Sequence, residues 1–403
     1  MTANQEGRSG RMVVVFEFLD TEPIENVITC MHFKVDKVVY FGYHDTIQDK
    51  KESTESFLKK YCGVQSVVFH PLSEHDLQSV LKSMRKEIEY EIGRRAKVFF
   101  DITGGEDLIL VAFGMLCREY RLAMHRYDIP SNKLIELDTG DDNGAICISK
   151  GVGIQHVVLD LDRLIELKGG KINYNRQKSY KRDGDQEFSS DVAKIWKVAS
   201  KYADYWNPFS EFLRNNMEPD ANLQVVRRLN MVLSALEASE TKLKTISRLN
   251  KIIDDLTSEG ILRDTSHVGG KYQFRFKNQN VKDCIWESGS LLEIHTYQKE
   301  KMTSTDCRVG VHLDWDGQLN DKPGSDVLNE IDVLSLDGNI PTFISCKSGK
   351  MGSQQALHAL YELETVTRRF GGKYARKKLV LAKELSRIYM ERAEEMGIEI
   401  CVE

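Results

Sequence analysis

Residues 329–349 read NEIDVLSLDGNIPTFISCKSG and place two carboxylates and a single lysine inside otherwise apolar runs. The two apolar runs predict two short strands around a turn. Because side chains alternate along a strand, Glu330 and Asp332 share one face, and Ser345 and Lys347 share a face of the neighbouring strand. Pairing of the two strands would bring Asp332 beside Lys347.

This combination of oxygen ligands and a fixed ammonium group suits the chemistry of hard cations. Carboxylates on a strand, next to a helix that carries Glu293, offer the oxygen ligands that Mg²⁺ and Mn²⁺ prefer. Such a metal lowers the pKa of bound water and neutralises charge on a phosphodiester. Lys347 would position the water or stabilise the charge of the transition state. A plain structural ion pair between Asp332 and Lys347 is the alternative.

The composition is that of an ordinary globular protein with two or three domains. The chain has 403 residues, of which 41% are apolar and 29% are charged. Its formal net charge of −5 gives no bulk attraction to nucleic acid, so any such binding needs a local basic patch. One candidate is the run 368–378, which either binds along a phosphate backbone or forms a solvated helix end. Its basic residues of interest are Arg368, Arg369, Lys373, Arg376 and Lys377.

Several classes of protein are not expected from this sequence. The eight cysteines include no Cys-x-x-Cys pair, so we expect no structural zinc site. The first strand–helix turn lacks Gly-x-Gly-x-x-Gly, and no Walker lysine follows a glycine loop, which argues against NAD and ATP. No signal peptide and no membrane-spanning apolar run are visible, which favours a reduced cytoplasmic protein without a membrane partner.

The first part of the chain, residues 1–167, predicts an α/β domain. Short apolar strands alternate with helical patterns, as is typical of a parallel sheet covered on both faces. The expected strands are 12–16, 38–41, 66–70 and 97–101, and the expected helices are 24–33, 53–61, 74–92 and 108–120. Three further strands at 122–127, 133–138 and 145–149, with a turn at 140–144, predict an antiparallel meander at the sheet edge.

The rest of the chain predicts a helical middle, residues 168–280, and a second α/β domain, residues 281–403. Residues 168–190 are polar and indicate a linker, and 191–259 indicate helices, with Pro208 and Pro219 each near a helix start. The order helix, glycine loop and strand over 246–276 resembles a winged helix. Around the two quoted strands we expect helices 283–298, 353–370 and 385–396 and strands 377–382 and 399–402.

A candidate phosphate-binding turn lies at residues 97–105, KVFFDITGG, where a strand ends in Asp-x-Thr-Gly-Gly before a helix. Open α/β sheets bind ligands at the carboxyl ends of their strands. Two glycines let backbone N–H groups approach an anion at the start of a helix. Thr103, Gly104 and Gly105 therefore form a candidate phosphate cradle, and a tight turn with a helix N-cap is the alternative.

The chain order of Glu293, Asp332 and Lys347, followed by a helix and the basic run, resembles the restriction-endonuclease-like PD-(D/E)xK nucleases. It is similar in particular to the version found in CRISPR-associated effectors that cyclic oligoadenylate activates. The resemblance implies Asp332 as the main ligand of Mn²⁺ or Mg²⁺, Glu293 as the acidic residue of the first helix and Lys347 as the catalytic lysine. The main-chain carbonyl of Cys346 would complete the metal shell.

Ser345 departs from the pattern of this family, which has an acidic residue two positions before the lysine. A hydroxyl is a poor metal ligand, so Glu330, a further catalytic candidate, or Glu362 would supply the missing carboxylate. The side chain of Cys346 is opposite in phase to Lys347, and we expect it to pack as a small apolar group.

The N-terminal part resembles a CARF domain, the sensor of cyclic oligoadenylates in type III CRISPR defence. The resemblance rests on segments 20–26, 41–46 and 101–106. It implies messenger contacts from Asp20, Thr21, Glu22, Asn26, Gly42, His44, Asp45, Thr46, Thr103, Gly104, Gly105 and Glu106. His44 would contact adenine or a phosphate, and an ordinary surface loop histidine is the alternative.

The three parts together most resemble fused CARF–nuclease effectors that cut DNA, RNA or both. We therefore expect a homodimer, because a two-fold axis matches the symmetry of cyclic tetraadenylate. One alternative is a transcriptional regulator without nuclease activity, built from the CARF domain and the winged helix. Another is a ring nuclease that degrades the messenger in its CARF pocket.

Overall fold

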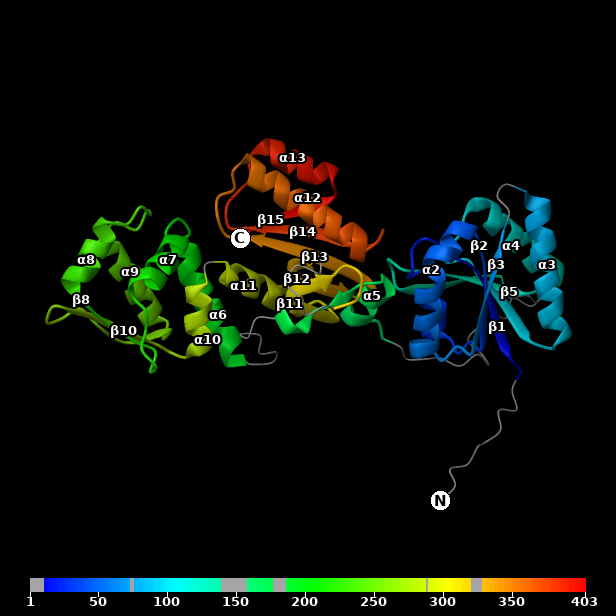
Figure 1. Cartoon of the computed structure of the whole chain (residues 1–403), viewed down its shortest axis with the longest axis horizontal. Coiled ribbons are helices and arrows are strands. Elements are labelled where there is room, and N and C mark those ends of the chain that lie inside the picture. The colour runs from blue at the N-terminus through cyan, green and yellow to red at the C-terminus, as the bar shows by residue number, and fades with distance from the viewer. Residues whose placement is uncertain (1–10, 73–75, 139–157, 177–185, 288, 320–327) are drawn as a thin grey trace, which may run out of the picture. The chain divides into compact units, whose positions relative to one another are not determined.

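The computed structural model describes residues 11–72, 76–138, 158–176, 186–287, 289–319 and 328–403. The chain divides into two compact units, whose elements are labelled in Figure 1. Unit 1 comprises Met1–Gly170 with two short segments, Gly338–Ile340 and Gly372–Tyr374, and unit 2 comprises the remainder. No helix among the described residues is both long and apolar enough to cross a membrane.

A six-stranded sheet forms the centre of unit 1, in the order β3-β2-β1-β4-β5-β6. Its strands are β1 Val13–Phe18, β2 Lys37–Gly42, β3 Ser66–Pro71, β4 Lys97–Asp101, β5 Ala123–Asp128 and β6 Lys133–Asp138. The first five are parallel to their neighbours, and β6 pairs antiparallel with β5. The inner strands are apolar runs because both of their faces are covered.

Helices cover both faces of this sheet, with α2 and α3 on opposite sides (Figure 1). The helices are α1 Ile28–His32, α2 His44–Phe57, α3 Leu77–Gly93, α4 Asp107–Tyr120 and α5 Leu161–Leu167, and a π-helical turn spans Leu58–Cys62. Val14 and Phe16 of β1 share an apolar cluster with Val80 of α3 and Phe113 of α4. This arrangement confirms the predicted α/β class.

The antiparallel pairing expected between 122–127 and 133–138 is present, since β5 and β6 pair antiparallel at the edge of the sheet. Strand β5 itself runs parallel to β4, because α4 carries the chain back before β5 begins. One expectation for unit 1 is wrong. Helix α2 begins at His44 and not at residue 53, so Asp45 and Thr46 lie in its first turn. The buried residues of α2, Thr54 and Phe57, lie near its C-terminal end. The first half of the helix therefore shows no apolar periodicity from which a helix could be predicted. The expected strand 145–149 and turn 140–144 lie outside the described residues.

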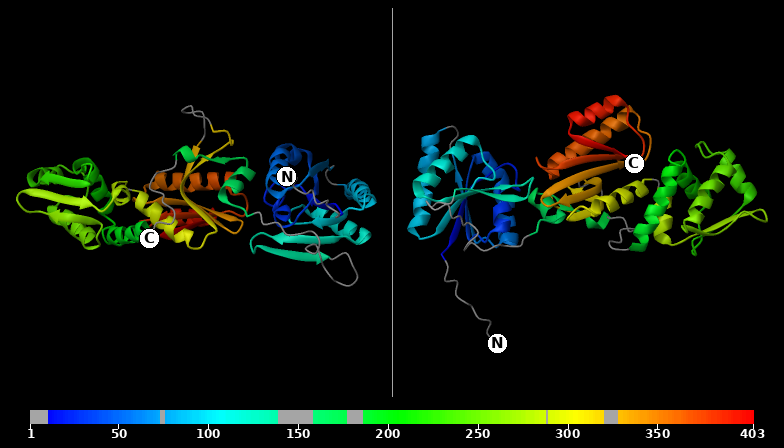
Figure 2. Two further views of the ribbon diagram at one scale, coloured as in Figure 1. Left: turned by 90° about the horizontal axis from the view of Figure 1, so that it is seen from below. Right: turned by 180° about the vertical axis from the view of Figure 1, so that it is seen from behind.

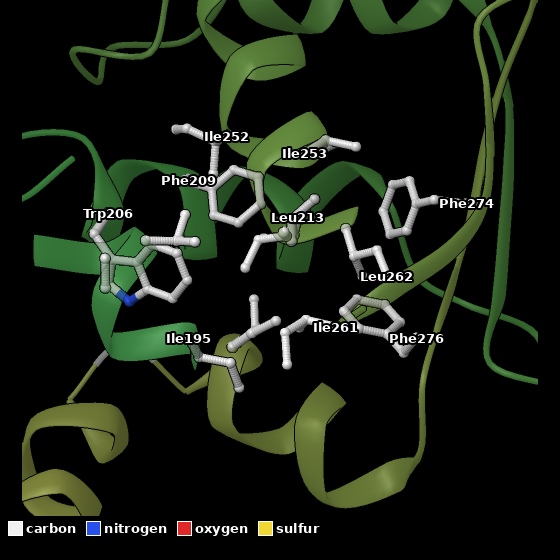
Figure 3. Packing of buried hydrophobic residues seen from close by; sticks show 14 of the residues in the cluster. Ile195, Trp206, Phe209, Leu213, Ile252, Ile253, Ile261, Leu262, Phe274 and Phe276 are labelled. Carbon is white, nitrogen blue, oxygen red and sulfur yellow. The ribbon is translucent and has the colours of Figure 1, made fainter. Parts of the chain in front are cut away.

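The winged-helix region, residues 186–286 of unit 2, combines five helices with a three-stranded sheet of order β8-β10-β9. Its elements are α6 Gln186–Lys201, α7 Trp206–Asn216, β8 Gln224–Arg228, α8 Leu229–Glu237, α9 Ile246–Ser258, β9 Leu262–Ser266, β10 Lys271–Phe276 and α10 Gln279–Trp286. Figure 3 shows its core, where Phe209 and Leu213 of α7 meet Ile253 of α9 and Phe274 of β10. The helix and hairpin from α9 to β10 follow the predicted order.

Two further expectations fail in this region. Strand β8 lies inside the stretch expected to be helical, and it forms because its residues pair antiparallel with β10, a partner distant in sequence. Pro208 lies in the first turn of α7, as predicted, but Pro219 follows the end of α7 and precedes β8. Of the expected linker, Lys171–Ile172 forms the short strand β7, and residues 177–185 lie outside the described residues.

The C-terminal part of unit 2 is built on a second six-stranded sheet, in the order β15-β14-β13-β12-β11-β7. Figure 2 shows its yellow, orange and red strands from two further sides. Its longer strands are β11 Asp306–Asp314, β12 Leu328–Asp337, β13 Ile340–Lys347, β14 Arg376–Leu381 and β15 Ile398–Val402, and its helices are α11 Ser290–Lys301, α12 Ser353–Phe370 and α13 Arg387–Glu395. Gly338 turns the chain between β12 and β13 with a φ of 61°, in the left-handed region that favours glycine.

The expected helix 283–298 is in fact two helices, α10 and α11. The chain leaves helical geometry at Glu287, which is extended, and α11 begins after Gly289. Strand β11 was not anticipated, and it pairs antiparallel with β12 along most of its length. Helix α12 and strands β14 and β15 lie where the sequence predicts them.

Candidate functional site

Strands β12 and β13 bring Asp332 and Lys347 together. Asp332 Oδ2 accepts hydrogen bonds from the backbone N–H of Cys346 at 2.6 Å and from Ser345 Oγ at 3.1 Å. Lys347 Nζ lies 3.9 Å from the same oxygen. Two hydrogen-bond donors and one ammonium group from β13 thus converge on one carboxylate oxygen of β12.

Burial makes the charge of Asp332 costly. Its side chain is 15% exposed, compared with 34% for Lys347. Burial raises the pKa of Asp332 above its ordinary value, although Lys347 and the hydrogen bonds from Cys346 and Ser345 oppose this rise. A buried carboxylate whose charge is incompletely compensated gains from a bound divalent cation, because the cation supplies the missing opposite charge.

Glu293 and the main-chain carbonyl of Cys346 are the other oxygen donors expected at a metal. Glu293 is 9% exposed in the first turn of α11. Burial raises the pKa of the Cys346 thiol, and the charges of Asp332 and Glu293 raise it further, so both carboxylates act on the same group. Hard oxygen donors of this kind fit Mg²⁺ or Mn²⁺. Among the described residues, no group of three or more His, Cys, Asp or Glu side chains is arranged for a metal, in keeping with Ser345 at an acidic position.

A glycine faces Asp332 across the pair β11–β12. Val309 and Val311 of β11 pair with Val333 and Ile331 of β12, so Gly310 lies opposite Asp332. The φ angle of Gly310 is 55°. No side chain from this position of β11 therefore crowds the carboxylate. The side chain of Cys346 belongs to an apolar cluster with Val333, so it packs as the sequence predicts.

The structure distinguishes the two carboxylates proposed to compensate for Ser345. Glu330 is exposed on β12, opposite His312 of β11. Glu362 is 42% exposed on α12, and its Oε2 lies 3.7 Å from His358 Nδ1. Glu362 lines the same cleft as Lys347, whereas the lining of that cleft does not include Glu330.

The cleft beside Lys347 has a volume of about 600 Å³ and is lined by both apolar and polar side chains. Gln354, His358 and Glu362 reach it from one face of α12, because they are four residues apart, and Lys350 reaches it from the preceding loop. Lys350, Gln354 and His358 were not predicted as site residues, although their spacing after the lysine strand was a usable signal. A cleft lined by two cations, Lys347 and Lys350, can hold a phosphate-containing substrate.

Most basic side chains of the run 368–378 form ion pairs or hydrogen bonds with other residues of the protein. Its ion pairs join Lys373 to Glu25 at 2.6 Å, Arg376 to Asp337 at 3.9 Å and Lys377 to Glu364 at 2.5 Å. Arg369 donates to the carbonyl oxygen of Trp315 at 2.8 Å, and Arg368 is exposed. None of the five residues expected to bind nucleic acid is in the lining of the cleft.

In unit 1, the loops after β2, β1 and β4 meet, because these strands are neighbours in a parallel sheet. The N–H of Gly105 donates to Asp20 Oδ2 at 3.1 Å, and Tyr43 Oη donates to Glu106 Oε2 at 2.8 Å. One edge of the sheet thus gathers the residues predicted to contact a messenger, namely Asp20, Thr21, Glu22, Asn26, Gly42, His44, Asp45, Thr46, Thr103, Gly104, Gly105 and Glu106.

Carboxylates already bind two backbone amides of the candidate phosphate cradle. Thr103 N–H donates to Asp101 Oδ1 at 3.0 Å, as Gly105 N–H does to Asp20. The Thr103 hydroxyl also bonds internally, because it donates to Asp101 and accepts from the N–H of Tyr127 at 2.8 Å. The carboxylate oxygens accept the hydrogen bonds that phosphate oxygens would otherwise accept from these two amides. An anionic ligand of this turn must therefore compete with the carboxylates.

Close packing explains why residue 104, the first glycine of the Thr103–Gly105 turn, has no side chain. A Cβ on Gly104 would lie 3.0 Å from Asp20 Cβ and 3.1 Å from Glu25 Oε2. Glu25 is buried, and burial raises the pKa of its carboxyl against the opposing effect of Lys373. Sequence reasoning did not single out Glu25, because a glutamate in a polar loop gives no sign that it will be buried.

Other predicted messenger residues shape the β1 loop itself. Asn26 Oδ1 accepts from Asp20 N–H at 2.7 Å, and its Nδ2 donates to the carbonyl oxygen of Asp20 at 2.8 Å. Glu22 is buried and forms an ion pair with Lys168. These contacts leave the side chains of Asn26 and Glu22 committed to the protein.

The comparisons with known proteins agree with this architecture. Residues 283–403 match a family model described as the Card1-like endonuclease domain. The structure of VC1899 from Vibrio cholerae has a TM-score of 0.67 at 19% identity, over 97% of this chain and 94% of that chain. Can2 from Sulfobacillus thermosulfidooxidans, solved in complex with cyclic tetra-adenylate, has a TM-score of 0.63 at 12% identity, over 96% and 92%. No protein with a curated description matches the sequence.

With metal removed by EDTA, we expect Asp332→Asn to raise the Tm at neutral pH. Because the pKa of Asp332 is raised in the folded state, the wild type loses stability as pH rises from about 3.9 through that raised value. The gain in Tm should grow over this window and persist above it. Thermal denaturation at a series of pH values measures it.

Asp337→Asn is the matched control, because Asp337 lies on the same strand with a side chain that is 62% exposed. Its Tm should stay close to that of the wild type. A fall in Tm at neutral pH for Asp332→Asn would contradict the view that burial dominates at this carboxylate.

Proposed function

We propose that this chain, whose residues 283–403 form a Card1-like endonuclease domain, is a metal-dependent nuclease that cyclic oligoadenylate activates in type III CRISPR antiviral defence. One observation carries the proposal. In the matched domain, the partly buried carboxylate of Asp332 is held by the amide of Cys346 and lies 3.9 Å from the ammonium of Lys347. The substrate would be DNA, RNA or both, bound in the cytoplasm.

The catalytic roles follow from the chemistry of these groups. Asp332, Glu293 and the carbonyl of Cys346 would hold Mg²⁺ or Mn²⁺. When bound, such an ion lowers the pKa of water and neutralises charge on the phosphodiester. Lys347 would orient the attacking water or stabilise the negative charge that develops on the phosphate. Ser345 contributes a hydrogen bond to Asp332 and no charge, so Glu362, in the cleft, is the better placed of the two compensating carboxylates.

The sensor role is supported by the meeting of three polar loops at the carboxyl edge of a parallel sheet. It is also supported by the fold that almost the whole chain shares with Can2, a protein solved with cyclic tetra-adenylate. We therefore propose cyclic tetraadenylate as the activator. In a homodimer with a two-fold axis, each copy would contact half of the ring.

Activation requires the messenger to favour the active state. A near-complete switch needs a difference in binding free energy on the order of 5 kcal/mol between the two states. The carboxylates of Asp20 and Asp101 provide a source for such a difference, because a messenger phosphate competes for the amides of Gly105 and Thr103.

Asp332→Ala and Lys347→Ala should each reduce cleavage by at least about 100-fold, since each removes a charge required at the reacting phosphate. Affinity for cyclic tetraadenylate, measured by calorimetry, should be unchanged. Asp337→Ala serves as the control with full activity. Cleavage within a few-fold of wild type in either site variant would refute the assignment.

Ser345→Asp should restore the acidic position and increase affinity for metal. We expect the Mn²⁺ concentration for half-maximal cleavage to fall several-fold, because a second carboxylate at this position adds charge beside Asp332. In EDTA the same variant should have a lower Tm than Ser345→Ala, through repulsion between the two carboxylates. An unchanged Mn²⁺ requirement would place the compensating carboxylate elsewhere, and Glu293→Gln, Glu330→Gln and Glu362→Gln would then be compared directly.

Gly104→Asp should abolish stimulation by messenger, because it adds bulk and negative charge within about 3 Å of Asp20 and Glu25. Gly114→Ala on the same helix–loop segment is the control, since a Cβ there meets no heavy atom within 4 Å. Calorimetry should show lost binding of cyclic tetraadenylate only for Gly104→Asp. Linear tetraadenylate should bind the wild type much more weakly, and persistent stimulation of Gly104→Asp would exclude this turn as the messenger site.

A further inference from the structure

The small sheet of the winged-helix region has two chemically different faces. Along β10, Tyr272, Phe274 and Phe276 are buried and belong to the core, where Figure 3 shows Phe274 and Phe276 beside Leu262 and Ile261. The intervening residues of β10 therefore lie on the opposite face of the sheet. We call this the outer face, and it comprises Gln224, Val226 and Arg228 of β8, Lys271, Gln273 and Arg275 of β10, and Arg263 of β9.

Cations on the outer face stand directly opposite one another. Arg228 of β8 is paired in register with Lys271 of β10. Arg275 of β10 is paired with Arg263 of β9. All four side chains belong to exposed residues. Like charges at directly opposed positions destabilise a sheet, so folding alone does not favour this arrangement.

Few carboxylates of the protein compensate these cations. Asp264 Oδ2 lies 3.4 Å from Arg275 Nε. In the part of the chain that the structure describes, Arg228, Lys271 and Arg263 have no carboxylate within ion-pair distance. This contrasts with the basic run 368–378, in which most cations are already paired. Among the described residues, this face therefore gathers three exposed cations without an ion-pair partner at directly opposed or neighbouring positions of one small sheet.

We infer that the outer face binds the phosphodiester backbone of the nucleic-acid substrate, an inference that rests on the proposed nuclease function. Closely spaced cations gain from a row of phosphates, which neutralises both like-charge pairs at once. Lys271 and Arg275 are about 13 Å apart along β10, roughly the axial length of four nucleotides of one strand. The amide of Gln273 lies between Lys271 and Arg275 along β10, and the amide of Gln224 lies opposite Arg275 on β8. Both can donate to phosphate or sugar oxygens.

The winged-helix region also touches the rim of the proposed active site within unit 2. Asn207 of α7 donates to the carbonyl oxygen and hydroxyl of Ser348 at 3.3 Å, and Ser348 follows Lys347. Asp204 forms an ion pair with Lys383 at 2.5 Å. Nucleic acid held on the outer face is therefore bound to the same compact unit as the catalytic cleft.

Charge reversal separates binding from folding at this face. We would compare Arg228→Glu, Lys271→Glu and the double variant with the wild type, in the full-length protein with EDTA to prevent cleavage. The ligands would be labelled 30-nucleotide DNA and RNA, each single- and double-stranded. Each single variant should bind them about tenfold more weakly than the wild type. The slope of log Kd against log salt concentration should fall by about 1. The Tm of each single variant should equal or exceed that of the wild type, because a like-charge pair becomes an opposite-charge pair.

The double variant should bind most weakly and should lose the gain in Tm, because two carboxylates then face each other. Arg214→Glu on α7 is the matched control, an exposed cation outside the outer face, and its affinity should change less than twofold. Unchanged affinity and salt slope in both single variants, or an equal loss in the control, would overturn the inference. So would binding to vesicles of anionic lipid without binding to any of the nucleic acids.

Cleavage assays keep this inference distinct from the proposed function. If the wild type never cuts with messenger and Mn²⁺ but the variants still lose binding, the outer face is a nucleic-acid surface on a protein that is not a nuclease. If the wild type cuts and the variants bind and cut normally, the nuclease function stands and the inference about the outer face is wrong.

Discussion

The hydrogen bond from the Cys346 amide to Asp332, at 2.6 Å, connects the fold of the C-terminal domain to its chemistry. It requires β12 and β13 to be adjacent, and it directs a carboxylate toward the strand that carries Lys347. Burial keeps this carboxylate from being fully stabilised by its protein partners, so its pKa is raised. The charged form of Asp332 therefore lowers the stability of the metal-free protein, and the same carboxylate is a suitable ligand for a divalent cation.

A related constraint operates in unit 1. Amides that could bind phosphate are already bonded to Asp20 and Asp101, and buried Glu25 lies against Gly104. If an anionic messenger binds at this turn as proposed, it must replace or rearrange these carboxylates, so its binding would be coupled to a change in the loops. Such coupling would give the proposed sensor a physical basis for switching, because a ligand can shift an equilibrium only through contacts that differ between two states.

The sequence predicted most of the structure where local pattern and tertiary packing agree. The apolar strands of unit 1, helix α12 and the pairing of Asp332 with Lys347 all follow from alternation and periodicity. Strand β8 was mistaken for helix because its pairing with β10 depends on a partner about 45 residues away. The polar start of α2 was missed because its first half buries no apolar side chain. The roles of Glu25 and His358 depend on burial and on a cleft, which a single sequence does not reveal.

A matrix of cleavage reactions tests the central claim most directly. Purified wild-type protein would be incubated with labelled single- and double-stranded DNA and RNA, with and without cyclic tetraadenylate and with Mn²⁺ or EDTA. We expect cleavage of at least one substrate only when messenger and Mn²⁺ are both present. Equal cleavage without messenger, cleavage in EDTA, or no cleavage of any substrate with both present would contradict this expectation.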